Sequence, residues 1–149
     1  MTKNLTNKVN KAVGPYGFNK NGLTWQRNNK IAFDVIGIQL ERYSSGISIN
    51  IGVYFKNLGN ETNPIEEMCH LRTSLSDNIG GVDLKRYKEE FDDSDIQVDE
   101  IIINLKNNGI PWFDTVKTMK GAMAAISANP QTDSSALLDA FKYKTIELG

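Results

Sequence analysis

The feature that most constrains this chain is a strict alternation of side chains over residues 47–56. Apolar residues alternate there with residues that are polar, amphipathic or glycine: Ile47, Ser48, Ile49, Asn50, Ile51, Gly52, Val53, Tyr54, Phe55 and Lys56. Because successive side chains of a strand point to opposite sides, this pattern predicts a strand with one apolar and one polar face. An antiparallel sheet built on such a strand buries one face and leaves the other in water.

Three further segments have the composition of strands, namely residues 23–27, 30–42 and 68–75. Asn28-Asn29 and Ser44-Ser45-Gly46 are turn sequences between successive strands. Short turns favour antiparallel pairing. We therefore expect a meander of about four strands.

The last of these segments repeats the alternation. The apolar side is expected to carry Cys69, Leu71 and Leu75, and the polar side His70, Arg72 and Ser74. Neighbouring strand residues point apart, which argues against Cys69 and His70 as a nucleophile and its base. Cys69 is interpreted as a small core residue.

Helical patterns flank the strands. Residues 5–13 and 98–105 both show apolar residues at helical spacing. Gly109 is expected to end the second helix in the left-handed conformation, and Pro111 to open the next helix. Further helical patterns cover residues 122–128 and the segment that follows Asp133 or Ser134.

The order of helix, strands and helices is typical of one α+β domain over residues 1–149. We expect an antiparallel sheet after an N-terminal helix, with the C-terminal helices packed on one face. No apolar run reaches the roughly 20 residues that span a bilayer, and residues 1–14 lack the apolar centre of a signal peptide. The single cysteine fits a reducing compartment, so a cytoplasmic location without membrane contact is expected.

Charge and ligand counts exclude several functions. Residues 1–60 hold eight Lys/Arg against two Asp/Glu, but these basic residues are scattered, so a solvated surface is favoured over nucleic-acid binding. One cysteine and one histidine fall short of the four ligands of a zinc site. Gly80-Gly81 lacks the Lys-Ser/Thr of a phosphate loop. No catalytic residue, metal or cofactor is assigned.

Two surfaces remain as candidate sites. The first is the polar face of the sheet, which is expected to present Gln39, Glu41, Asn50, Tyr54, His70 and Arg72. The second is an acidic run that includes Glu89, Glu90, Asp92, Asp93 and Asp95. The acidic run fits a solvated loop, a site for a basic partner or a divalent-cation site, although it lacks the spacing of an EF-hand loop.

Four motifs occur in a characteristic order along the chain. They are Gly-Phe-Asn-Lys-Asn-Gly-Leu-Thr-Trp (residues 17–25), Gln-Leu-Glu-Arg (39–42), Ile-Asn-Ile-Gly-Val-Tyr (49–54) and Asn-Gly-Ile-Pro-Trp-Phe (108–113). Together they resemble the bacterial family called domain of unknown function 4304 (DUF4304), over roughly residues 5–116. The resemblance implies an α+β domain with an antiparallel sheet and supplies no activity. Some members look like relatives of immunity proteins, which neutralise toxins.

These observations favour a non-enzymatic binding module, immunity-like or regulatory, whose partner is a basic, toxin-like protein. The alternative is a small-molecule-binding or enzymatic domain that uses the polar sheet face. A third interpretation is a homodimer formed through an edge strand or through that same face.

Overall fold

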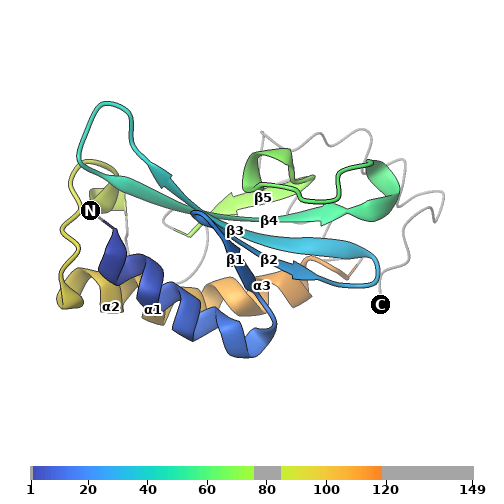
Figure 1. Cartoon of the computed structure of the whole chain (residues 1–149), viewed down its shortest axis with the longest axis horizontal. Coiled ribbons are helices and arrows are strands. Elements are labelled where there is room, and N and C mark those ends of the chain that lie inside the picture. Colours follow the sequence, from blue (N-terminus) through green and yellow to red (C-terminus); the bar gives the residue numbers. More distant parts are fainter. Residues whose placement is uncertain (1, 76–84, 119–149) are drawn as a thin grey trace.

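The computed structural model describes residues 2–75 and 85–118, which form a five-stranded antiparallel sheet with its helices on one side (Figure 1). The strands pair in chain order: β1 (Asn19–Asn21), β2 (Thr24–Asn28), β3 (Ala32–Leu40), β4 (Ile47–Phe55) and β5 (Leu71–Ser74). The helices are α1 (Lys3–Val13), α2 (Asp95–Asn104) and α3 (Ile110–Thr115). Short 3-10 turns are η1 (Gly14–Tyr16), η2 (Lys56–Leu58), η3 (Glu66–Met68) and η4 (Lys85–Lys88).

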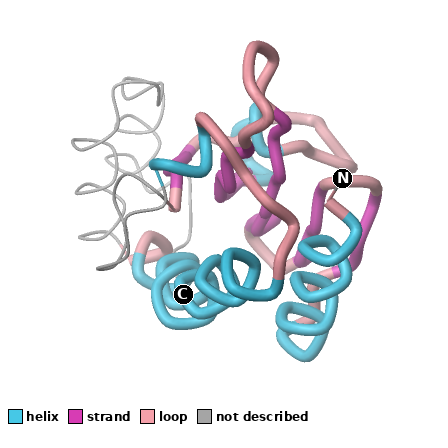
Figure 2. Tube along the Cα trace, turned by 90° about the vertical axis from the view of Figure 1, so that its left-hand side faces the viewer, coloured by secondary structure: helices cyan, strands magenta, loops and turns pink. Residues whose placement is uncertain are grey.

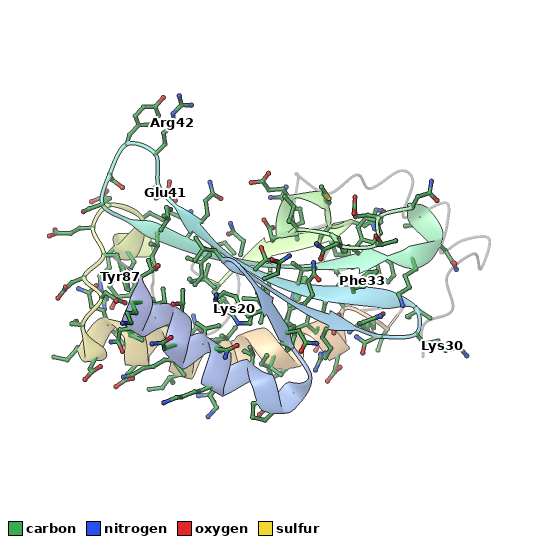
Figure 3. The ribbon with its side chains drawn as sticks, viewed as in Figure 1. Lys20, Lys30, Phe33, Glu41, Arg42 and Tyr87 are labelled. Atoms are coloured by element: carbon green, nitrogen blue, oxygen red, sulfur yellow. The ribbon has the colours of Figure 1, made fainter. Side chains whose placement is uncertain are left out.

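The alternating strand is confirmed as β4, which begins at Ile47 as the pattern predicts and ends at Phe55, one residue before the pattern does. β4 pairs with β3 along its whole length, from Ala32 opposite Phe55 to Leu40 opposite Ile47. The hairpin between them projects from the sheet, with Glu41 and Arg42 on it and Tyr87 near its base (Figure 3). The α+β class is confirmed as well.

The sheet has one strand more than expected. β1 is short and entirely polar, so no apolar alternation marks it in the sequence. It pairs with β2 across a turn in which Gly22 adopts a φ of 65°, a conformation that glycine enters without steric cost.

The core lies between the sheet and the helices, which run beneath the strands in Figure 2. The buried face of the sheet, here called the inner face, meets side chains from all three helices. The strands contribute Trp25, Ile36, Ile38, Ile49, Ile51, Val53 and Phe55 to this core, and the helices contribute Leu5, Val9, Val98, Ile101 and Phe113. Complete burial of one such aliphatic side chain contributes roughly 1.5–3 kcal/mol. Trp25 is fully buried and donates its indole N–H to Asn10 Oδ1 at 3.3 Å, so it packs within the core.

A buried carboxylate, Asp34, joins the sheet to the end of α3. Its Oδ2 accepts hydrogen bonds from Arg27 Nε at 2.9 Å and from Asn29 Nδ2 at 2.8 Å. Lys117 Nζ lies 2.6 Å from Oδ1, an ion contact whose geometry falls outside that of a hydrogen bond. The Arg27 guanidinium also lies over the ring of Phe18, 4.7 Å from its centroid. Arg27 and Lys117 compensate the negative charge of Asp34, and this attraction offsets the free-energy cost of removing the carboxylate from water.

The predicted helix break at Gly109 is wrong. α2 continues through a π-helical segment, η5 (Leu105–Gly109), directly into α3, and Gly109 has a right-handed φ of −68°. The glycine serves close packing, because a Cβ there would lie 3.0 Å from Leu105 Cδ1 and 3.1 Å from Leu75 Cδ2. In a regular α-helix the ring of Pro111 would clash with the carbonyl four residues earlier, and the wider π turn relieves that clash.

The strand predicted over residues 68–75 begins at Leu71, three residues later than expected. The prediction that Cys69 shares a face of the sheet with Leu71 is wrong. Met68 ends the turn η3, and Cys69 lies beside Val35 and Tyr54 on the side of the sheet opposite Leu71. Cys69 is buried as expected, but in a second cluster outside the main core. The alternating pattern does not predict the side of Cys69, because this residue precedes β5 and belongs to the segment that crosses the opposite face of the sheet.

In the described part of the chain, no helix combines the length and the apolar character needed to cross a membrane. The predicted turn at Gly80-Gly81, the helical pattern over residues 122–128 and the last helix after Asp133 or Ser134 lie outside the described residues.

A charge placed at the centre of β4 should unfold the domain. Ile51 is fully buried, so Ile51→Asp would bury a carboxylate without a partner and is expected to lower the free energy of unfolding by several kcal/mol, of order 3–5. Ile96, which is 80% exposed in the first turn of α2, offers the matched control. Ile96→Asp should change stability little, since an acid is favourable near a helix N-terminus. Urea denaturation of both variants checks this, and equal midpoints for Ile51→Asp and wild type would refute the burial of β4.

Candidate functional site

The face of the sheet that points away from the helices, here called the outer face, carries the predicted polar residues. In the strand register, Gly37 lies opposite Asn50, and Val35 lies opposite Gly52, which is itself opposite Arg72. β2 adds Thr24 and Gln26 to the same rows. The register therefore brings side chains from four neighbouring strands onto one surface.

Residues 56–70, here called the covering segment, run across this outer face between β4 and β5 (Figure 1). Two sheet glycines let it approach the strands. A Cβ on Gly52 would lie 2.6 Å from Cys69 Cβ, and one on Gly37 would lie 3.2 Å from Glu66 Cβ. Any larger residue at position 52 would displace the segment, so glycine is required for this contact.

Beneath the covering segment the outer face is apolar. Val35, Tyr54 and Cys69 form a buried cluster, against which Phe33 packs. The Tyr54 hydroxyl accepts a hydrogen bond from the backbone N–H of Glu61 at 3.0 Å. The expectation of a water-exposed polar face is therefore wrong for this part of the sheet, because the covering segment shields it.

A salt bridge closes the segment onto the sheet edge. Arg72 donates from Nε to Glu66 Oε1 at 2.8 Å and from Nη2 to Oε2 at 3.1 Å. Glu66 is only 6% exposed, and these hydrogen bonds raise the pKa of Arg72 above its ordinary value. A bidentate pair of this kind fixes direction as well as distance, so it holds η3 against β5.

A pocket of about 110 Å³ opens between η3 and the strands. Side chains from β2, β3, β4 and the covering segment line it: Thr24, Gln39, Asn50, Ile65, Glu66 and Glu67. Asn50 Nδ2 donates to Gln39 Oε1 at 3.3 Å across the pocket floor. The pocket joins polar groups on rigid strands to an apolar rim at Ile65, which is partly exposed.

The six predicted residues of the polar face separate into groups. Gln39 and Asn50 line the pocket, and Arg72 reaches it through Glu66. Glu41 accepts a hydrogen bond from Ser48 Oγ at 2.5 Å, at the root of the projecting hairpin. Tyr54 and His70 pack together at the other end of the face, with ring centroids 4.6 Å apart, and His70 Nδ1 accepts from the N–H of Phe55 at 3.0 Å.

Six of the residues that line the pocket are not predicted by the sequence analysis: Thr24, Gly37, Ile38, Ile65, Glu66 and Glu67. A signal for them does exist. Gly37 and Gly52 occupy outward positions of two central strands, and glycine within a strand marks a place where other backbone approaches closely.

The acidic run has two of its carboxylates in fold contacts. Asp93 accepts hydrogen bonds from the backbone N–H groups of Asn4 and Leu5, each at 2.8 Å, and so caps the N-terminus of α1. Asp95 accepts from Lys8 Nζ at 3.0 Å, and this hydrogen bond lowers the pKa of Asp95. Asp92 is exposed beside them.

Cys69 lies in surroundings that keep its thiol protonated. The thiol donates to the carbonyl of Ile65 at 3.7 Å, and burial, with a smaller effect of the Glu66 carboxylate, raises its pKa. A thiol nucleophile needs the opposite shift. Over residues 2–75 and 85–118, no three His, Cys, Asp or Glu side chains come together as a metal site.

A comparison with protein families assigns most of the chain to one family. The model of a family described as Domain of unknown function (DUF4304) matches residues 9–115, a range that includes every pocket residue and the covering segment. No curated protein matches the chain, and no solved structure does.

The buried thiol has a measurable consequence for stability at alkaline pH. Because burial raises the pKa of Cys69 above its ordinary value of 9.0, the unfolded chain loses this proton first as the pH rises. The thiol's contribution to stability is complete below pH 9.0 and is lost above it, by about 1.4 kcal/mol between pH 8 and pH 10. Urea denaturation of wild type and Cys69→Ala at both pH values isolates this term. A difference between the two proteins that stays constant with pH would show that the folded thiol ionises normally.

Proposed function

We propose that this chain, which belongs to the DUF4304 family, is a non-enzymatic binding module that captures a protein partner on the outer face of its sheet. The observation that carries the proposal is the pocket between η3 and the strands, where Gln39 and Asn50 present amide groups beside Ile65. Polar groups around an apolar contact, in a concave site, are what a partner's anchoring side chain requires.

The size of the pocket favours a protein over a metabolite. Small-molecule sites usually enclose roughly 300–1,000 Å³. This pocket of about 110 Å³ has room for a single side chain or a comparable group. The surrounding surface is a sheet whose strands are held by continuous pairing, so the site is formed before the partner arrives.

The chemistry of the neighbouring groups favours binding over catalysis. The thiol of Cys69 is buried and protonated, and Nδ1 of His70 accepts a backbone hydrogen bond. Both carboxylate oxygens of Glu66 accept from Arg72. Groups committed to such contacts hold structure, whereas a general base needs an accessible lone pair within reach of its substrate.

A regulatory or immunity-like role fits such a module, acting by occupying the surface of another protein. A cytoplasmic location agrees with the single cysteine, which is a free and buried thiol. The acidic run is the less favoured contact surface, because Asp93 and Asp95 already stabilise the start of α1.

Affinity capture with the full chain tests this proposal. A partner isolated from the native host is purified, and its dissociation constant is measured by calorimetry for wild type and variants. Asn50→Ala and Gln39→Ala should each weaken binding about thirtyfold, the loss of roughly 2 kcal/mol that marks a hot-spot residue. Asn7→Ala removes the same amide from the exposed surface of α1 and should leave the affinity unchanged.

The outcomes separate the candidate surfaces. Loss of affinity in Glu89→Gln and Asp92→Asn but not in Asn50→Ala would place the contact on the acidic run and refute the proposal. Self-association that Asn50→Ala abolishes, in the absence of any other partner, would make a second copy of the chain the occupant of the face.

A further inference from the structure

We infer that the pocket between η3 and the strands takes the basic side chain, lysine or arginine, of the partner. This inference rests on the proposed function and adds the chemical class of the group that enters. It follows from the charges that line the pocket, from the hydrogen-bonding groups on its floor and from its rim.

Of the two carboxylates that line the pocket, only one is held in an ion pair among the described residues. The two charged side chains that line the pocket are Glu66 and Glu67. Glu66 is buried and bonded at both oxygens to Arg72, so its charge is compensated within the protein. Glu67 is exposed at the pocket edge, and no hydrogen bond or ion pair holds its carboxylate among the described residues. A single cation in the pocket would therefore meet one carboxylate that has no hydrogen bond or ion pair of its own among the described residues.

The floor offers acceptors to such a cation. Asn50 and Gln39 join through one amide hydrogen bond, which leaves the Asn50 Oδ1 atom as an acceptor. The hydroxyl of Thr24 also lines the pocket and accepts through its lone pairs. Ammonium and guanidinium groups are donors only, so they match carboxylate, amide and hydroxyl oxygens together.

The rim suits the stem of a long basic side chain. Ile65 is 41% exposed at the pocket edge, where it offers apolar surface beside the polar floor. Lysine and arginine lay their methylene groups along apolar surface while the charged end remains in a polar site. An acidic side chain would instead meet the exposed carboxylate of Glu67, a juxtaposition that discriminates against it.

Model side chains test the inference directly by ¹⁵N nuclear magnetic resonance titration of the full chain. The probes are the Nα-acetyl methylamides of lysine, arginine, norleucine and glutamate, which share one backbone. Lysine and arginine should shift the side-chain amide signals of Asn50 and Gln39 saturably, and glutamate should not. Norleucine, which keeps the stem without the charge, should bind more weakly than lysine.

Charge neutralisation supplies the matched variants. Glu67→Gln should weaken the lysine probe by about two- to five-fold, the range of an exposed ion pair. Asp114→Asn makes the same change on the exposed surface of α3, on the helix side of the sheet, and should leave the affinity of that probe unchanged.

The results distinguish failure of this inference from failure of the proposed function. Equal binding of norleucine and lysine, preference for glutamate, or no shift with any probe would overturn the cationic occupant. If Asn50→Ala still weakens the partner in those cases, the binding face stands. If the lysine probe binds but Asn50→Ala leaves the partner's affinity intact, the pocket is cationic and the proposed docking face is wrong.

Discussion

The close approach of the covering segment to two glycines decides what the outer face of the sheet becomes. A Cβ at Gly52 would lie 2.6 Å from Cys69 Cβ, closer than such atoms approach, and one at Gly37 would lie 3.2 Å from Glu66 Cβ. Without these contacts the outer face would be a wet polar surface of the kind usual for antiparallel sheets. With them it gains a small apolar cluster, a buried ion pair and a pocket.

Buried charges join distant segments on both faces of the sheet. On the inner face Asp34 meets Arg27 and Lys117, which connects β2 and β3 to the end of α3. On the outer face Glu66 meets Arg72, which connects the covering segment to β5. Such pairs contribute little net stability, because desolvation offsets their attraction, but removal of one partner leaves a buried charge. We interpret both pairs as devices that fix the geometry of the fold.

Local pattern was enough to predict most of the fold. The alternation over residues 47–55 specifies β4 because it depends only on which side of a strand each residue occupies. The periodicity of α1 is equally local.

The pocket could not be predicted in this way, because it depends on contacts between residues that are distant in the sequence. Glu66 and Glu67 gain their roles only once η3 rests on Gly37, and Gly109 is explained only by its neighbour Leu75. Asp34 is the only charged residue of β3, and its partner Lys117 comes from the far end of the described chain.

The covering segment lies directly on the sheet and thereby builds the pocket. Nuclear Overhauser effects between the Hα protons of Gly52 and the Hβ protons of Cys69 test it most directly, because the two residues are in van der Waals contact. We expect a strong effect for this pair and a weaker one between Gly37 Hα and Glu66 Hβ. Hα protons of Gly52 that show effects only to their strand neighbours and to water would mean that the face is open. The pocket would then not exist in solution.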